Sequence, residues 1–189
     1  MAEKLFSKVM VIFFLVLLIL GFTVPGFINS SNGVVQNQVE PRLCQTDADC
    51  YLTCDEQPVP VICLQNLCQQ NECGYAYFEY EQNPLTFQLE VILNNEKISL
   101  ENRTTQGNFF VKFENNMVKM YSQRLSLNAV LSKVGLLLDS NCLLVDGNRY
   151  CADEDNFLSV LIKGNETADV GNYIPQEGDK IEIGYGKGN

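Results

Sequence analysis

Apolar and polar residues follow different spacings in different stretches of this chain, and each spacing predicts a different structure. Residues 9–28 are uncharged and mostly apolar, residues 29–42 are polar with no apolar period, and apolar and polar positions alternate from about residue 84 onward. A long apolar run is typical of a membrane-spanning helix, a polar run of a flexible stalk, and alternation of half-buried β-strands. We therefore expect an N-terminal transmembrane helix and a β-rich domain in the second half of the chain.

The alternation predicts two β-hairpins. Every second residue is apolar over residues 85–93, and the asparagines at 94–95 offer a two-residue turn. Residues 109–121 alternate in the same way around a second Asn-Asn pair at 115–116. Two-residue turns of this kind connect neighbouring antiparallel strands.

One short helix is expected after these hairpins. Ser126 is a typical N-cap, and Gly135 is typical of the position just after a helix. The apolar residues between them recur at helical spacing: Leu127, Val130, Leu131 and Val134. This apolar face should lie on the sheet.

The last predicted strand follows Gly178-Asp179 and continues through Lys180-Ile181-Glu182-Ile183. With this strand, the order of a hairpin, a helix and further strands over residues 84–186 resembles the β-grasp fold of ubiquitin-like and sulfur-carrier proteins. The resemblance implies an α+β domain with one helix on a mostly antiparallel sheet.

Six of the eight cysteines lie within residues 43–74, in a density that small exported domains use in place of a large core. No two of them form a Cys-x2-Cys pair, and the chain has no histidine, so the usual ligand spacing of a zinc site is missing. The segment therefore predicts a disulfide knot. Fifteen pairings of six cysteines are possible.

The spacing from Cys44 through Cys50, Cys54 and Cys63 to Cys68 resembles the cysteine-stabilised α/β peptides, which include defensins and short scorpion toxins. Cys50 and Cys54 stand four residues apart, so on a helix beginning after Thr46 both sulfur atoms would share one face. The resemblance implies one pairing of the six cysteines: Cys44 with Cys63, Cys50 with Cys68, and Cys54 with Cys73.

The last two cysteines can be placed by counting from a turn. Asp146-Gly147 favours a two-residue hairpin turn, and counting outward sets Cys142 directly opposite Cys151. The Cα atoms of such a pair lie ~4.5 Å apart, within the range of a disulfide. We expect this bridge to be structural, because it lacks the Cys-x-x-Cys arrangement that activates a thiol.

The N-terminus indicates export. Lys4 and Lys8 precede the apolar run, which favours a cytoplasmic tail over residues 1–8 and a signal anchor over residues 9–28 in the cell membrane. The alternative is a cleaved signal peptide, because the densest apolar run covers only residues 9–22. Either route places the cysteines outside the cytosol, where disulfides persist.

Composition excludes several classes of function. Without histidine, no Ser-His-Asp or Cys-His nucleophile can exist. A formal net charge of −10 repels nucleic acid. No sequence pattern indicates a cofactor or a bound metal ion.

An aromatic run follows the knot. Tyr75, Tyr77, Phe78 and Tyr80 could form a binding surface for a glycan or a peptide, since tyrosine combines a flat apolar ring with a polar tip. The alternative is a strand that packs the knot on the sheet, with Tyr75 and Tyr77 on one face and Ala76, Phe78 and Tyr80 on the other.

The expected organisation is a cytoplasmic tail (1–8), a transmembrane signal anchor (9–28), a stalk (29–42), the cysteine-rich knot (43–74), a connecting strand or linker (75–83) and a β-rich α+β domain (84–189). For such a chain we favour a membrane-anchored interaction or structural module that meets an extracellular protein or glycan and is not an enzyme. The alternative is an exported enzyme, or an accessory subunit of one, that uses carboxylates or a tyrosine. Converging carboxylates in a cleft would favour the enzyme.

Overall fold

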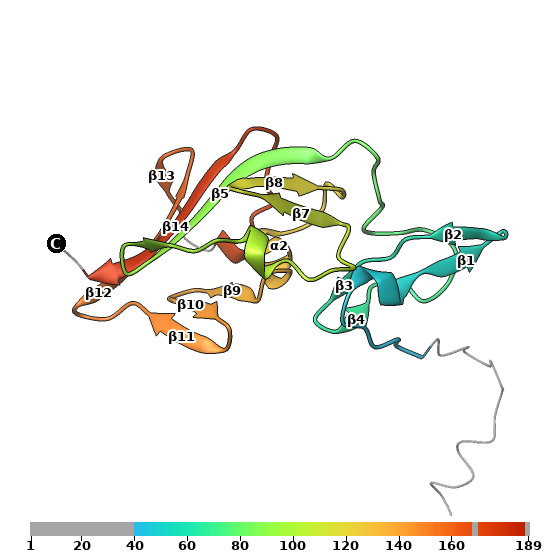
Figure 1. Ribbon diagram of the computed structural model, residues 1–189, viewed down its shortest axis with the longest axis horizontal. Coiled ribbons are helices and arrows are strands. Elements are labelled where there is room, and N and C mark those ends of the chain that lie inside the picture. Colours follow the sequence, from blue (N-terminus) through green and yellow to red (C-terminus); the bar gives the residue numbers. More distant parts are fainter. Residues whose placement is uncertain (1–39, 168–169, 188–189) are drawn as a thin grey trace, which may run out of the picture. The chain divides into compact units, whose positions relative to one another are not determined.

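The computed structural model describes residues 40–167 and 170–187 (Figure 1). The predicted tail, the transmembrane helix at 9–28 and most of the stalk lie outside these residues. Within them, no helix has the length and apolar character needed to cross a membrane. The expected fold class is therefore corrected: the described part is mostly β, with one short α-helix and four disulfides, and shows no transmembrane helix.

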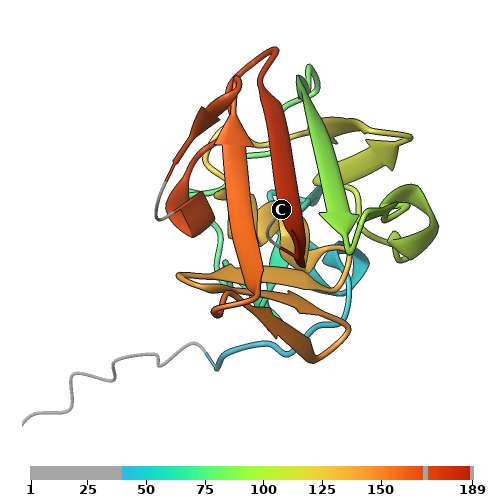
Figure 2. The same ribbon diagram turned by 90° about the vertical axis from the view of Figure 1, so that its left-hand side faces the viewer.

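The largest sheet has its first and last long strands side by side at its centre. Its order is β13-β12-β14-β5-β8-β7, and β6 pairs with the end of β5. The strands are β5 (Leu85–Leu93), β6 (Glu96–Lys97), β7 (Val111–Glu114), β8 (Met117–Met120), β12 (Asn156–Ile162), β13 (Asn165–Glu166) and β14 (Lys180–Lys187). β5 and β14 run parallel, while the other neighbours are antiparallel (Figure 2).

The two predicted hairpins differ in length. Beyond Asn94-Asn95, only the two residues of β6 return along β5 before the chain turns into the 3-10 helix η2 (Glu101–Arg103). The longer neighbour of β5 on that side is β8. β7 and β8 form the second hairpin in the register that its turn predicts, with Lys112 opposite Lys119. The like charges are relieved because Lys119 pairs with Glu114 at 2.7 Å.

The predicted helix is α2 (Leu127–Ser132), and the Ser126 hydroxyl accepts a hydrogen bond from the Ala129 N–H (3.3 Å) as an N-cap. Its apolar residues Leu127, Val130 and Leu131 are fully buried in the core. The helix packs mainly on strand β9 (Leu136–Asp139) of a second sheet and on the 3-10 helix η3 (Val170–Asn172) rather than on the main sheet. The core joins alternate residues of the main sheet to α2 and to the second sheet: Phe87, Leu89, Val91, Val118, Ile181 and Ile183 with Leu127, Val130, Leu131, Leu136 and Leu143.

The second sheet has the order β11-β10-β9, from β9 (Leu136–Asp139), β10 (Cys142–Val145) and β11 (Asn148–Cys151). The turn between β10 and β11 lies at Asp146-Gly147, and Cys142 stands opposite Cys151 with the Cα atoms 4.0 Å apart. The two cysteines form a disulfide, at the position that counting from the turn gives.

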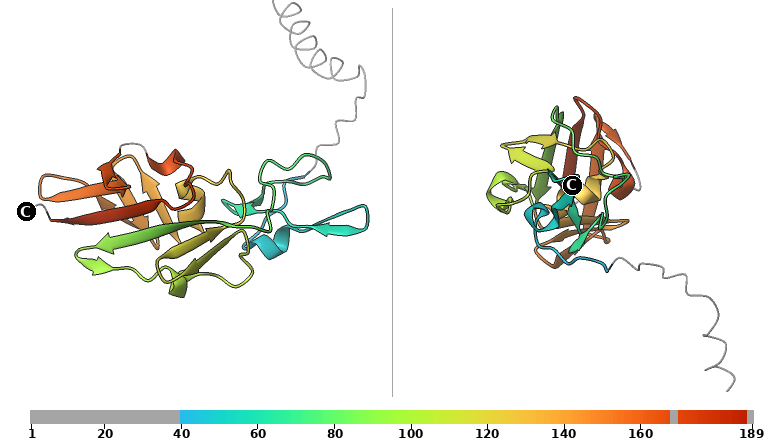
Figure 3. Two further views of the ribbon diagram at one scale, coloured as in Figure 1. Left: turned by 90° about the horizontal axis from the view of Figure 1, so that it is seen from above. Right: turned by 90° about the vertical axis from the view of Figure 1, so that its right-hand side faces the viewer.

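The knot, coloured cyan, lies at one end of the described unit (Figure 3). Its bridges are Cys44–Cys63, Cys50–Cys68 and Cys54–Cys73, the pairing that the resemblance to cysteine-stabilised peptides implies. It contains two small hairpins, β1 (Leu52–Cys54) with β2 (Gln57–Val59) and β3 (Cys63–Leu64) with β4 (Leu67–Cys68).

The expected helix through Cys50 and Cys54 was wrong. A single 3-10 turn, η1 (Asp47–Cys50), begins after Thr46 and ends at Cys50, whereas Cys54 ends strand β1. The reason is the turn that follows: Asp55 and Glu56 both have positive φ, and they fold β2 back on β1. Residues 52–54 therefore satisfy their backbone groups in a sheet ladder.

A buried ion pair joins the knot to the rest of the fold. Asp47 of η1 lies 2.5 Å from the Nζ atom of Lys133, which follows α2, and the two side chains are 0% and 4% exposed. The same carboxylate accepts hydrogen bonds from the backbone N–H groups of Cys63 (2.9 Å), Phe109 (3.0 Å) and Phe110 (3.2 Å). Lys133 also donates to the Cys63 carbonyl at 2.6 Å. Ion pairing and hydrogen bonding thus offset the cost of burying both charges.

The substitution Lys133→Met tests this junction. It leaves the Asp47 carboxylate buried without a cation, and we expect a loss of about 3–5 kcal/mol in the free energy of unfolding. Urea unfolding followed by circular dichroism measures it. Lys119→Met is the matched control, because it breaks a solvent-accessible pair worth about 0–1 kcal/mol. Equal losses in the two variants would contradict a dominant role for the buried pair.

Candidate functional site

The aromatic run after the knot divides into an outward and an inward half. Residues 75–83 form no strand, so the expectation of a packing strand was wrong and the segment is a linker. Tyr75 and Tyr77 are 78% and 58% exposed. Phe78 and Tyr80 are half-buried against the main core. The predicted division is nevertheless confirmed, because Tyr75 and Tyr77 face outward while Phe78 and Tyr80 face the core.

Tyr80 belongs to the packing of the molecule. Its ring stacks on Tyr121 with centroids 5.4 Å apart and meets Phe110 edge-on at 5.2 Å. Burial is the main cause that raises the pKa of its hydroxyl. Tyr80 therefore anchors the linker, and we remove it from the candidate binding surface.

The two outward tyrosines are organised by Arg124. The guanidinium carbon lies 5.2 Å from the ring centre of Tyr77 and 6.0 Å from that of Tyr75, within the range of cation–π attraction. Arg124 also donates a hydrogen bond to the Tyr75 hydroxyl, which is the main cause that raises the pKa of the guanidinium. The rings of Tyr75 and Tyr77 are thus held in place by contacts with one permanent positive charge.

Tyr77 and Arg124 line an open groove of about 480 Å³, which we name the Tyr–Arg groove, and Tyr75 contacts Arg124 beside it. Its residues come from the knot, the linker, the loop before α2, α2, β9, the 3-10 helix η3 (Val170–Asn172) and the loop after it: Leu64, Gln65, Gln69, Tyr77, Phe78, Arg124, Ser126, Asn128, Ala129, Ser132, Leu137, Asn172 and Ile174. The groove therefore requires both the knot and the β-rich part.

Several polar side chains of this groove are already used by the fold. Asn128 donates from Nδ2 to the Leu138 carbonyl and accepts from the Leu138 N–H, both at 2.7 Å, so its amide substitutes for a strand neighbour of β9. Ser126 caps α2, and the Ser132 hydroxyl donates to the Ala129 carbonyl at 2.8 Å. These polar groups line the groove, but they already make hydrogen bonds within the protein.

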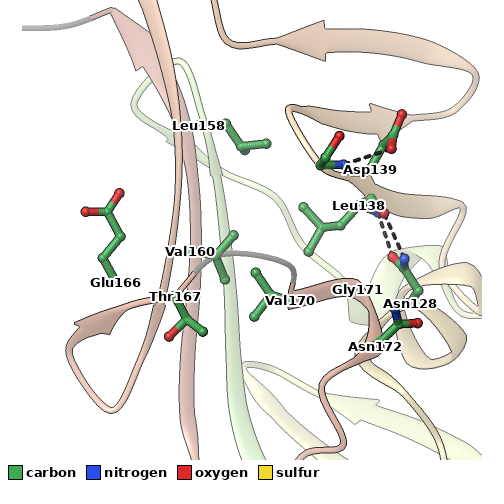
Figure 4. Close-up of a pocket in the computed structure, with 11 residues that line it drawn as sticks. Asn128, Leu138, Asp139, Leu158, Val160, Glu166, Thr167, Val170, Gly171 and Asn172 are labelled. Atoms are coloured by element: carbon green, nitrogen blue, oxygen red, sulfur yellow. Dashed lines mark hydrogen bonds between the residues drawn. The ribbon is translucent and has the colours of Figure 1, made fainter.

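A second cavity of about 620 Å³ adjoins the groove and shares Asn128 and Asn172 with it (Figure 4). Gly171 passes close against the Asn128 amide: a Cβ atom at this position would lie 2.3 Å from Nδ2. A glycine is therefore needed at 171 to keep Asn128 bonded to β9.

The carboxylates around this cavity do not converge. Asp139 and Glu166 lie on opposite sides of it (Figure 4). Asp139 accepts a hydrogen bond from the Ser140 N–H (2.8 Å) and contacts Arg149 at 3.3 Å. Hydrolysis by paired carboxylates needs two acids that face one reacting bond, and this cavity does not provide them.

A buried carboxylate outside these cavities, Asp179, bonds the loop that precedes β14. Asp179 is fully buried, accepts from the Tyr173 hydroxyl (2.5 Å) and the Gln176 N–H (2.8 Å), and pairs with Lys163 at 2.8 Å. Burial by itself raises the pKa of the Asp179 carboxyl, but these donors outweigh it and hold the pKa below its ordinary value. Burial and the bond to Asp179 raise the pKa of Tyr173 to about 12. The Tyr173 hydroxyl therefore stays protonated and donates to Asp179, and these hydrogen bonds hold the loop before β14.

The sulfur atoms of Cys44, Cys50 and Cys68 lie within 4.8 Å of one another. All three are oxidised in disulfides, and a disulfide lacks the thiolate that binds a metal ion. The cluster is therefore the centre of the knot and carries no metal chemistry.

Sequence reasoning found Tyr75 and Tyr77 but missed Arg124. The available signal was a lone arginine two residues before a helix N-cap in an acidic chain. Its contact with the tyrosines joins residues almost fifty positions apart and has no local pattern.

Comparisons with protein-family models, curated proteins and solved structures found no match to this chain. The resemblance to cysteine-stabilised peptides and to β-grasp proteins therefore stays a prediction from spacing and element order, and the structure itself shows a sheet-rich fold with four disulfides.

The structural role of Asp179 predicts an acid-dependent loss of stability. Because its pKa is lowered in the native state, its stabilisation is complete above about pH 4, the ordinary value of a free aspartate, and is lost as pH falls below it. Urea unfolding at pH 7 and pH 3 should show a smaller acid loss in Asp179→Asn than in the unsubstituted protein. Glu154→Gln, at an exposed acid, is the control. An acid loss in Asp179→Asn equal to that of the unsubstituted protein would refute the assignment.

Proposed function

We propose that this protein is an interaction module that works outside the cytosol and binds its partner through the Tyr–Arg groove. The observation that carries the proposal is that Arg124 contacts two exposed tyrosines, Tyr75 and Tyr77, and that Arg124 and Tyr77 line a groove. Tyrosine and arginine are enriched where binding energy is concentrated, because both bring large contact areas and specific polar contacts.

Four disulfides and no free cysteine in the described residues suggest an extracellular or secreted protein. This part of the proposal depends only on residues 40–187. It does not require a membrane anchor.

A binding role accounts better than catalysis for the groups described. The two acids of the cavity, Asp139 and Glu166, lie on opposite sides of it (Figure 4), and Asp179 is fully buried and bonded to Tyr173, Gln176 and Lys163. We therefore propose no catalytic residue and no cofactor, and the partner is an extracellular protein or glycan.

Binding screens on a random peptide display library and on immobilised glycans test the proposal. We expect saturable binding in at least one screen, and at least a tenfold loss of affinity in Tyr77→Ala, because the substitution removes one wall of the groove. Surface plasmon resonance with the recovered binder measures the loss.

Phe157→Ala is the matched control, since Phe157 is an aromatic residue of β12 with 48% exposure that does not line the groove. Its affinity should equal that of the unsubstituted protein. No binding in either screen, or equal binding by Tyr77→Ala and the control, would defeat the proposal.

A further inference from the structure

We infer that the Tyr–Arg groove takes a peptide segment of a protein partner in which a bulky apolar side chain stands next to a single carboxylate. This inference rests on the proposed function and specifies its ligand. Three properties of the groove support it: exposed apolar side chains, polar groups most of which already make hydrogen bonds within the protein, and one charge.

Part of the lining is apolar. Leu137 and Ile174 line the groove and each keep 39% of their surface exposed, and Leu64, Phe78 and Ala129 are the other aliphatic or phenyl side chains of the lining. These side chains come from separate segments that the fold brings together. An apolar side chain that covers them removes apolar surface from water on both partners, which is the dominant favourable term in association.

The polar lining favours a peptide over a glycan. Sugar hydroxyls bind through several free side-chain donors and acceptors, yet Asn128, Ser126 and Ser132 already use their polar atoms within the fold. Gln69 likewise donates to the carbonyls of Leu64 (3.2 Å) and Leu67 (3.0 Å). Among the described residues, Gln65 and Asn172 are the lining amides that make no side-chain hydrogen bond within the protein. A ligand with many hydroxyl groups would therefore find side-chain amides for few of them.

Arg124 sets the charge of the ligand. It is the one charged residue among the described residues that line the groove. A guanidinium has five N–H donors in a planar fork that matches a carboxylate, and the hydrogen bond to Tyr75 leaves most of them free. The chain as a whole carries a formal charge of −10, which repels a strongly acidic partner. A ligand with one carboxylate beside an apolar residue can pair with Arg124 without carrying enough negative charge to be repelled by the chain.

The experiment selects peptides from a random display library on the full, oxidised protein and then measures synthetic copies by fluorescence polarisation. We expect the selected peptides to share Leu, Ile, Phe or Met next to Asp or Glu. Changing that acid to its amide, or Arg124→Gln in the protein, should each weaken binding about tenfold. Combining the two changes should add little, because both remove the same contact.

Lys112→Gln is the matched control, since Lys112 is an exposed cation that lies 5.3 Å from the ring centre of Tyr121, away from the groove. Its affinity should be unchanged. Arg124→Glu should in turn prefer the peptide whose acid is replaced by lysine. Arg124 is exposed, so these variants are expected to fold, and circular dichroism checks this.

The outcomes separate the two proposals. This inference would be overturned by peptides whose affinity falls in Tyr77→Ala but does not change in Arg124→Gln or when the peptide's own acid is replaced by its amide. The proposed binding module would then still stand. Glycan binding that depends on Tyr77 would have the same two consequences. Binding that depends on no groove residue would overturn both.

Discussion

The arrangement of this protein depends on how one buried carboxylate is satisfied. Asp47 comes from a single turn of the knot, and its four donors come from Lys133, from Cys63 and from the two residues that lead into β7. A charge without such partners would be too costly to bury. Because these partners lie on both sides of the junction, the knot has one position on the β-rich part, and Ile62 of the knot enters the main core.

This fixed junction makes the Tyr–Arg groove possible. Leu64 lies next to Cys63, so the Lys133 contact that holds Cys63 also places one wall of the groove. The opposite wall comes from α2 and β9, which Asn128 joins through two hydrogen bonds to Leu138. The linker also adds to the lining, and its Tyr80 is anchored on Tyr121. Recognition at this site therefore uses surfaces that no single segment of the chain contains.

Local signals predicted local structure well. The Ser126 cap, the register of the β7–β8 hairpin and the position of Cys142 opposite Cys151 each depend on neighbours within about ten residues. Sequence reasoning did not predict the Asp47–Lys133 pair, which spans eighty-six positions, or the contact of Arg124 with the tyrosines. The knot helix failed because pairing of β1 with β2 outweighed a spacing that suits a helix. The N-terminal prediction lies outside the described residues.

The linker is also the covalent connection between the knot and the β-rich part. All three knot disulfides join cysteines that precede Gly74, and the fourth disulfide lies within the second sheet. A protease that cuts between Gly74 and Pro84, where Tyr75 and Glu79 are exposed, would leave every disulfide intact. Yet no covalent bond would then connect the two walls of the groove. After such a cut, the groove would be held together only by noncovalent contacts across the junction, chiefly the Asp47–Lys133 pair and the packing of Ile62 in the main core.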